Sequence, residues 1–326
     1  MIAAEVPLMR VPTVVALSVA AVLAFSSARA EEKAWHCTNY EGEPIGPIPL
    51  TMSYLVDEHA PANDTRADAN FDKNGKPHWR IDLKGHVWLP DAATRKAHAH
   101  PVLVYNHGHD STQPPCAIVN FFRNNGFLVF APLRRGQGVS TGVFIADYAK
   151  ACDDCDEQEV YDARETMYLQ KQSEDIVDAV KWISKNDYAD PDEIVILGHS
   201  YGGMAVLYAN TLFPKLEKGQ HRAIIDISGG ELTWDRNQII HATLPAAVAN
   251  GRYPILFLQP ANGVSLGSTF NLVKVARKDD RAHIYPPIDI KDKDDDVHTR
   301  FIKSRDQVFD GWGQDALEFL ARHKIK

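Results

Sequence analysis

The chain has 326 residues, of which 44% are apolar, so a single domain of this length can bury a sizeable core. Its 35 Lys and Arg residues against 43 Asp and Glu residues give a formal net charge of −8 at pH 7. This acidic balance argues against a nucleic-acid partner, because phosphate backbones are bound mainly through Lys and Arg.

The first thirty residues are predicted to be a signal peptide rather than part of the fold. Residues 11–25 are almost entirely apolar, Arg10 precedes them, and Ala28-Arg29-Ala30 follows as a cleavage site before Glu31. The apolar run is short for a permanent membrane anchor, and no cysteine stands immediately after the cleavage site to carry a lipid. We therefore expect a periplasmic or secreted protein without a stable membrane anchor. Retention of the segment as an uncleaved anchor is the alternative.

Four cysteines follow the predicted cleavage site, and an even number in an exported chain predicts disulfide bonds. Three connectivities are possible, and we favour Cys37–Cys116 with Cys152–Cys155. The C-x-x-C spacing of the second pair also occurs at thioredoxin-like redox sites. Acidic residues on both sides of that pair disfavour a thiolate, so a structural disulfide is the favoured interpretation.

Residues 31–100 are predicted to form a β-rich N-terminal lead-in that packs on the main domain. Residues 78–89 alternate between apolar and polar side chains, which is typical of a half-exposed antiparallel strand. The polar, turn-rich residues 61–76 predict a loop.

Over residues 101–326, short apolar runs alternate with helical stretches, which predicts an α/β fold with a mainly parallel sheet flanked by helices on both faces. Residues 173–185 have apolar side chains at helical spacing, with Ser173 as the predicted N-cap. Residues 139–172 are interpreted as the longest insertion, able to line a cleft. The predicted strands cover 102–105, 127–130, 194–197, 223–227, 255–258 and 282–285, and a closing helix is predicted around 317–320.

The most informative motif is Gly198-His199-Ser200-Tyr201-Gly202-Gly203. It stands between the apolar run 194–197 and the helical run 204–209, so it predicts a strand, a tight turn and a helix. Gly-x-Ser-x-Gly in that setting is the nucleophile elbow of α/β-hydrolases. The glycines let the backbone bend where a Cβ would clash, and the serine hydroxyl points into the cleft above the strand ends. Ser200 is therefore the predicted nucleophile.

A serine hydroxyl needs a base to take its proton, and the chain order in this fold is nucleophile, acid, then histidine. His298 follows an irregular acidic loop after the last predicted strand, and a loop in that place is where the base belongs. We favour it over the other histidines that follow the elbow, which are His221, His241, His283 and His323.

These features make residues 101–326 similar to the dienelactone hydrolase-like branch of the α/β-hydrolases. The resemblance implies a carboxylester hydrolase with a serine or cysteine nucleophile, a histidine and an acid. It also implies an oxyanion hole formed by the backbone N–H groups of Tyr201 and His109. The segments that carry the resemblance are 106–108, 134–138, the elbow at Ser200, 228–230, 285–287, and His298 with Phe301.

His107 and His109, with His98 and His100 before them, also permit a metal site, since alternate strand positions share a face. No Cys or Glu joins them at the spacing of a metal site. We interpret them as packed or surface residues and expect neither a metal nor an organic cofactor.

The acid is less well defined by the sequence. The resemblance expects an aspartate in the turn after 255–258, but Gly263 occupies that position, and the neighbouring Asn262 cannot stabilise an imidazolium as a carboxylate does. Glu231, in the turn after 223–227, is the favoured acid, with Asp235 four residues further on. A solvated loop carboxylate is the alternative interpretation of Glu231. The acidic run 292–296 is interpreted as solvated.

The favoured hypothesis is an exported serine hydrolase that acts on a small-molecule ester through an acyl-enzyme on Ser200, with His298 as base. Amides and lactones are chemically adjacent substrates. One alternative is a binding protein that kept the fold and lost the acid. Another is a disulfide-handling protein that uses Cys152 and Cys155. The sequence leaves the oligomeric state open.

Overall fold

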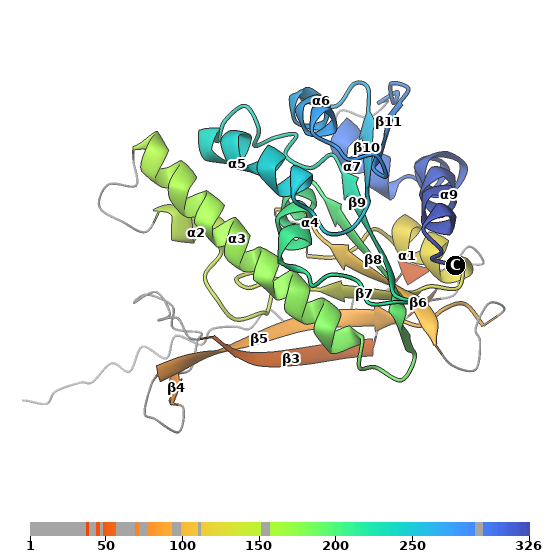
Figure 1. The fold of residues 1–326 in the computed structure, drawn as a ribbon, viewed down its shortest axis with the longest axis horizontal. Coiled ribbons are helices and arrows are strands. Elements are labelled where there is room, and N and C mark those ends of the chain that lie inside the picture. Colours follow the sequence, from red (N-terminus) through yellow and green to blue (C-terminus); the bar gives the residue numbers. More distant parts are fainter. Residues whose placement is uncertain are drawn as a thin grey trace, which may run out of the picture. The chain divides into compact units, whose positions relative to one another are not determined.

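A nine-stranded β-sheet organises the described part of the chain (Figure 1). The computed structural model describes residues 37–38, 44–45, 48–56, 69–71, 77–92, 99–109, 112–150, 157–290 and 296–326. Within these residues the sheet has the strand order β11-β10-β9-β8-β6-β7-β5-β3, and β4 pairs with β5. Its strands are β3 Ile48–Val56, β4 Ala69–Phe71, β5 Pro77–Trp88, β6 His100–Asn106, β7 Leu128–Pro132, β8 Ala189–His199, β9 His221–Ile227, β10 Ile255–Pro260 and β11 Arg281–Tyr285.

The strands from β11 to β7 in sheet order are parallel, whereas β5 pairs antiparallel with β7, β3 and β4. The predicted mainly parallel sheet is therefore confirmed, and so is the antiparallel strand predicted over residues 78–89. Since β5 pairs with β7, strands of the β-rich lead-in extend the same sheet. Each predicted parallel strand overlaps a strand of the structure. The predicted boundary between the lead-in, residues 31–100, and the main domain, residues 101–326, stays a prediction.

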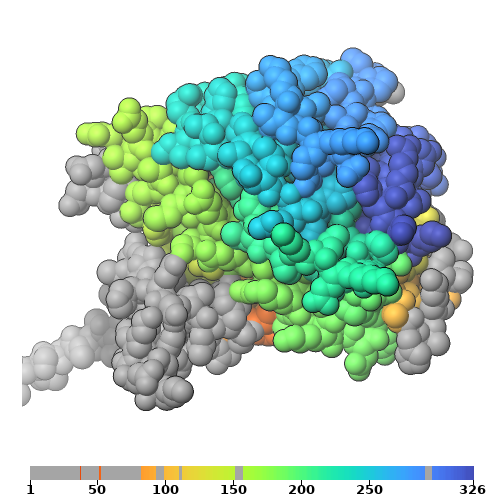
Figure 2. Space-filling model, in the orientation of Figure 1, coloured from red at the N-terminus to blue at the C-terminus, as the bar shows by residue number. Residues whose placement is uncertain are grey.

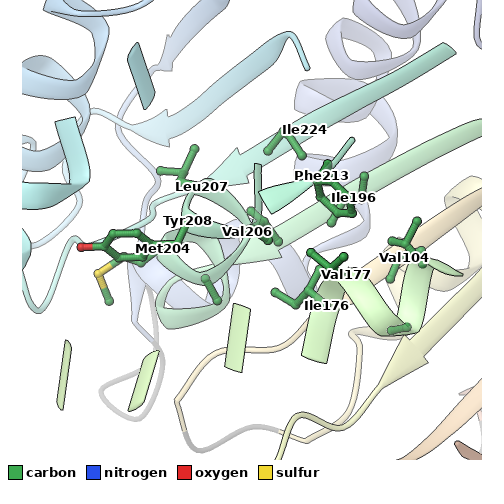
Figure 3. Close-up of a cluster of buried hydrophobic side chains, with 14 of the residues drawn as sticks. Val104, Ile176, Val177, Ile196, Met204, Val206, Leu207, Tyr208, Phe213 and Ile224 are labelled. Carbon is green, nitrogen blue, oxygen red and sulfur yellow. The ribbon is translucent and has the colours of Figure 1, made fainter. Parts of the chain in front are cut away.

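Helices cover both faces of the sheet, as predicted, because successive strand residues point to opposite sides. Val104 of β6 belongs to an apolar cluster with α3 (Gln158–Ile183) and α4 (Tyr201–Leu212). Its neighbour Tyr105 belongs to a cluster with α1 (Cys116–Asn124) and α9 (Gly313–Arg322). Figure 3 shows helix residues of the first cluster packed on strand residues such as Val104 and Ile196. The helices are α1 Cys116–Asn124, α2 Ile145–Lys150, α3 Gln158–Ile183, α4 Tyr201–Leu212, α5 Gln238–Ala249, α6 Gly267–Lys274, α7 Val297–Lys303, α8 Arg305–Gln307, the π-helical η1 Val308–Trp312 and α9 Gly313–Arg322.

The helix predicted over residues 173–185 begins instead at Gln158, and the interpretation of Ser173 as an N-cap is wrong. The Ser173 hydroxyl is buried inside α3 and donates to the Leu169 carbonyl oxygen at 2.9 Å. The region 139–172, interpreted as the longest insertion, therefore contains α2 and the first half of α3. The periodicity missed this half because its buried face includes Asp162 and Glu165 in place of apolar residues.

The predicted disulfide between Cys37 and Cys116 is confirmed, with the two Cα atoms 5.3 Å apart. It joins β1 (Cys37–Thr38), which pairs with β2 (Pro44–Ile45), to the first residue of α1. Cys152 and Cys155 lie outside the described residues, as do the predicted signal peptide 1–30 and residues 291–295.

The segment predicted as a loop over 61–76 contains the short strand β4, and its remaining residues are outside the described ranges. Among the helices that the structure describes, none has both the length and the apolar character needed to cross a bilayer.

Candidate active site

Ser200 occupies a sharp turn between β8, which ends at His199, and α4, which begins at Tyr201. Its backbone angles are φ 57° and ψ −118°, a conformation that residues with a side chain rarely adopt. The Ser200 N–H donates to the carbonyl oxygen of Ile227 at 2.8 Å, which ties the turn to the end of β9. The predicted strand, tight turn and helix are all present.

Two glycines of the motif allow the turn to close. A Cβ built on Gly198 would overlap the carbonyl oxygen of Gly202, and a Cβ built on Gly202 would overlap the carbonyl oxygens of Asn106 and His107. Helix α4 can therefore begin directly against the segment that follows β6 only because position 202 has no side chain. This close approach brings the end of β6 to the nucleophile.

The predicted oxyanion donors belong to the two segments that meet at Ser200. One is Tyr201, the first residue of α4, where backbone N–H groups lack partners within the helix and favour negative charge. The other is His109 in residues 107–109, which we call the oxyanion loop. A Cβ built on Gly108 would lie 3.7 Å from the Ser200 Cβ, so this loop passes close to the nucleophile.

His298 and Glu231, separated by 67 residues in sequence, form a buried pair. Their Nδ1 and Oε2 atoms are 2.6 Å apart, and the two residues are 8% and 2% exposed. A carboxylate only accepts, so His298 donates through Nδ1, which leaves Nε2 without its proton in the neutral ring. The structure thus brings together the predicted base and the favoured acid, and the interpretation of Glu231 as a solvated carboxylate is wrong.

The carboxylate of Glu231 lies where a side chain of residue 263 would stand. Its Oε1 accepts the backbone N–H of Val264, and a Cβ built on Gly263 would overlap Oε1. Asn262 exchanges hydrogen bonds with the backbone of Ile288, both at 2.9 Å, and so is engaged elsewhere. The position at which the resemblance expected an acid is therefore filled by an acid from the preceding turn.

His298 lies in a short helix rather than in a loop, which corrects the sequence interpretation. It is the second residue of α7, and Asp296 caps this helix by accepting the Thr299 N–H at 2.7 Å. The cap fixes the direction in which the helix leaves the acidic segment. Asp296, interpreted as a solvated charge, thus has a defined structural role.

His199 is a residue that sequence reasoning did not assign. Its ring centroid is 4.4 Å from that of His298, and its Nε2 donates to the His298 carbonyl oxygen at 3.3 Å. Burial and the neighbouring His298 hold the pKa of His199 well below its usual value, so the ring stays neutral. The only sequence signal that His199 would contact the predicted base was its place beside the nucleophile Ser200.

Segments distant in sequence surround the site. In Figure 2 the surface of the residues after β9 (teal) lies between those of α3 (yellow-green) and of the residues after β10 (blue). Arg236, after β9, forms an ion pair with Glu165 of α3 at 2.7 Å, and Ser265, after β10, donates to Asp235 at 3.0 Å. The turn that carries Glu231 is thus braced on both sides.

The other histidines that follow the elbow have different neighbours. His241 packs on Trp234, and the ring of His323 packs on Phe319. His283 lies 3.6 Å from Asp315. In the ranges that the structure describes, no three His, Cys, Asp or Glu side chains are placed to hold a metal ion, and His98 lies outside those ranges.

Comparisons with known proteins agree on the fold. The model of the prolyl oligopeptidase family matches residues 154–219, which include the elbow. No curated protein matches the sequence. Among solved structures, the chain is similar to acetyl xylan esterase 1 from a Thermoanaerobacterium species, at 15% identity over 84% of this chain and 88% of that chain, with a TM-score of 0.50. An acetyl xylan esterase from a Paenibacillus species is 12% identical over 85% and 89%, also with a TM-score of 0.50.

A similar match is the acylaminoacyl peptidase of Pyrococcus horikoshii, at 14% identity over 79% of this chain, with a TM-score of 0.50. This chain spans 41% of that peptidase's length. At such identities the likeness establishes the α/β-hydrolase fold. The family match and this fold together support a serine hydrolase of the α/β-hydrolase type.

Proposed function

We propose that the protein is an exported serine hydrolase that cleaves carboxylic esters through an acyl-enzyme on Ser200. The observation that carries the proposal is the buried contact of 2.6 Å between His298 Nδ1 and Glu231 Oε2, in which the ring of His298 also packs on His199, the residue before a serine held in a nucleophile elbow. A nucleophile, a base and an acid that orients the base are the parts that acyl transfer requires.

In the proposed mechanism, Ser200 Oγ attacks the ester carbonyl carbon while His298 Nε2 takes the hydroxyl proton. Glu231 holds the ring through Nδ1 and compensates the positive charge that develops on it. The N–H groups of Tyr201 and His109 stabilise the tetrahedral oxyanion. The ester C–O bond then breaks, and His298 returns the proton to the departing alkoxide. Water attacks the acyl-enzyme with His298 again as base, which releases the acid and restores Ser200.

The ester preference rests on the resemblance to the dienelactone hydrolase-like branch. Apolar side chains beside the acid are consistent with it: Leu232 is 55% exposed and Val264 is 71% exposed. Both can contact an uncharged acyl or alcohol group. The match to the prolyl oligopeptidase family favours a second candidate function, hydrolysis of an amide or peptide bond by the same residues.

The acid-deficient binding protein is the remaining alternative. It was motivated by Gly263 at the expected acid position. Because Glu231 places a carboxylate against His298, that motivation no longer holds.

The test combines a fluorophosphonate probe with paired substrates. We expect the purified protein to be labelled on Ser200, located by peptide mass spectrometry, and Ser200→Ala to abolish labelling. p-Nitrophenyl esters of short and long acyl groups should be hydrolysed faster than the matching p-nitroanilides. Faster anilide cleavage would favour the peptidase function, and a folded protein that neither labels nor hydrolyses would favour the binding protein.

Export is a separate part of the proposal. The disulfide between Cys37 and Cys116 supports it, because such bonds persist mainly in oxidising compartments. Mass spectrometry of the protein from the periplasm or medium should show a chain that begins at Glu31 and has no free thiol. Four free thiols would contradict the predicted disulfides, and a chain found only inside the cell with residues 1–30 attached would contradict export.

A further inference from the structure

Two adjacent buried arginines after β7 have different partners. Arg135 has a charged partner, since it forms an ion pair with Asp175 at 2.8 Å. Arg134 is fully buried, and the oxygens that accept its hydrogen bonds in the described part of the chain belong to neutral groups. Its Nη2 also lies 3.4 Å from His107 Nδ1. Burial lowers the pKa of Arg134 to about 10, so the guanidinium remains charged at neutral pH.

A buried cation is tolerated only where several acceptors replace its water. For Arg134 two of these acceptors are the carbonyl oxygens of the oxyanion loop. Nη1 donates to the His107 oxygen at 2.8 Å, and Nη2 donates to the Gly108 oxygen at 3.1 Å. The third is the side-chain oxygen of Gln172 on α3, 3.3 Å from Nε. The guanidinium therefore joins this loop to α3.

The orientation of these carbonyl groups determines the orientation of the N–H groups that the proposed reaction uses. In a trans peptide the C=O and N–H bonds point in opposite directions. The carbonyl of Gly108 and the N–H of His109 belong to one peptide group. Since the carbonyl oxygen faces Arg134, the N–H of His109 faces away from it.

The Gly108 oxygen accepts a second hydrogen bond, from the loop itself. His107 Nδ1 lies 2.8 Å from it, and two acceptors would repel at that distance, so Nδ1 carries the proton. Burial and the charge of Arg134 hold the pKa of His107 well below its usual value, which keeps the ring neutral. Donation from a charged group polarises the peptide and strengthens its N–H as a donor.

We propose that Arg134 is a positioning residue for the oxyanion hole: it orients and polarises the peptide group between Gly108 and His109, next to Ser200. The proposal rests on the proposed function, because it assigns the His109 N–H to the developing oxyanion. A guanidinium suits this task since its planar fork reaches two carbonyl oxygens at once, which an ammonium group does not do in the same geometry.

The experiment compares Arg134→Lys with Arg135→Lys, which replaces a buried neighbour that bonds to Asp175 and, among the described residues, forms no hydrogen bond to the oxyanion loop. Loss of one oxyanion donor lowers kcat by about a hundredfold or more. We expect Arg134→Lys to lower kcat about 30-fold or more, with KM within about twofold, since the donor acts in the transition state. Arg135→Lys should lower the melting temperature but keep kcat within about twofold of the wild type.

A second measurement reads the oxyanion hole directly. A trifluoromethyl ketone forms an anionic tetrahedral adduct with the serine, and its affinity should fall in Arg134→Lys in proportion to kcat/KM. If that variant does not fold, Gln172→Leu keeps Arg134 but removes its partner on α3. It should lower kcat and ketone affinity in the same direction by a smaller factor.

Equal kcat losses in both lysine variants, or a raised KM at unchanged kcat, would overturn the positioning role. Unchanged ketone affinity in Arg134→Lys would also overturn it. If the wild-type protein is labelled by the fluorophosphonate and these results are found, only this inference fails. A wild-type protein that neither labels nor hydrolyses would overturn the proposed function and this inference with it.

Discussion

The turns after β9 and β10 differ in one decisive respect: the first contributes a carboxylate and the second contributes room for it. Glu231 follows β9 and reaches His298, whereas Gly263 follows β10 and leaves the space that the carboxylate fills. The second turn also supplies the N–H of Val264 to the same carboxylate. In the proposed site the position of the acid thus depends on both turns: one supplies the carboxylate, and the other supplies the space and an N–H donor.

The geometry of the sheet makes this arrangement possible. β9 and β10 are adjacent parallel strands, so their carboxyl ends lie about 5 Å apart. A residue that follows either strand can therefore approach His298, provided that the other turn leaves space. The side chain of glutamate is one methylene longer than that of aspartate, which lengthens the reach from the turn after β9, a strand that lies one place further than β10 from β11 in the sheet.

The largest loss of kcat should come from replacing the predicted nucleophile or the predicted base. Ser200→Ala and His298→Ala should each lower kcat by about ten-thousandfold or more, because nucleophile and base act as a unit. For the same reason the double variant should be little worse than either single variant. Rates with a p-nitrophenyl ester, with thermal unfolding as the control for folding, test this. Losses that multiply in the double variant would argue that the two residues act independently.

Glu231→Gln should lower kcat by about a thousandfold, since a neutral amide cannot compensate the imidazolium charge. Asp235→Asn is the matched control: it is four residues away, and its carboxylate receives a hydrogen bond from the Ser265 hydroxyl rather than from His298. We expect that control to stay within about threefold of the wild type in kcat. Similar kcat values for Glu231→Gln and the wild type would show that Glu231 is not the acid.

Exchange of the two residues should move the acid between the turns. From the sequence alone, Gly263→Asp would be expected to raise activity. The structure reverses this expectation, because the new side chain would overlap the Glu231 carboxylate, so Gly263→Asp by itself should lower kcat. In the double variant Glu231→Ala/Gly263→Asp that overlap is gone. We expect it to be at least about tenfold more active than Glu231→Ala, a coupling that a double-mutant cycle measures. Additive effects would show that the turns do not share one carboxylate position.

β9 itself contains another buried carboxyl group, that of Asp226, and its effect is measured through stability rather than through kcat. Asp226 is fully buried, and desolvation raises its pKa to about 7, from an ordinary value near 4. The folded protein therefore keeps this proton up to about pH 7, whereas the unfolded chain loses it near pH 4. The stability that this group contributes is present below about pH 4 and is lost as pH rises to about 7.

Asp226→Asn removes the titration, since an amide stays neutral and its oxygen can still accept the Gly229 N–H. The melting temperature of the variant relative to the wild type should therefore rise by about 5 °C between pH 5 and pH 8. Thermal unfolding of both proteins across this range is the measurement. Parallel curves would mean that Asp226 is ionised in the fold throughout.

Much of the fold follows from local pattern, since buried parallel strands are short apolar runs and the chain contains one such run in each of β6 to β10. The first half of α3 does not follow the pattern. There Glu165 is buried in an ion pair with Arg236, and such a contact 71 residues away leaves no trace in hydrophobic periodicity. Patterns of apolar spacing predict elements whose buried face is apolar, and they miss elements whose buried face is charged.

The site divides in the same way. The elbow at Ser200 was predictable because its conformation needs glycines at fixed neighbouring positions. The sequence offered Glu231 as an acid but not its contact with His298, which depends on how two adjacent turns share space. Arg134 and Arg135 look equivalent in the sequence, and only the structure distinguishes which of them bonds to the loop beside Ser200.

At Ser200 the residue that would make the fold most stable differs from the residue that the proposed reaction needs. Angles of φ 57° and ψ −118° are costly for serine and easy for glycine, which lacks a Cβ. Ser200→Gly should therefore yield a protein that is inactive yet more stable by about 1 kcal/mol, whereas Ser200→Ala keeps the strain. Selection for folding yield alone would enrich glycine at this position, so the serine persists only where selection acts on turnover as well.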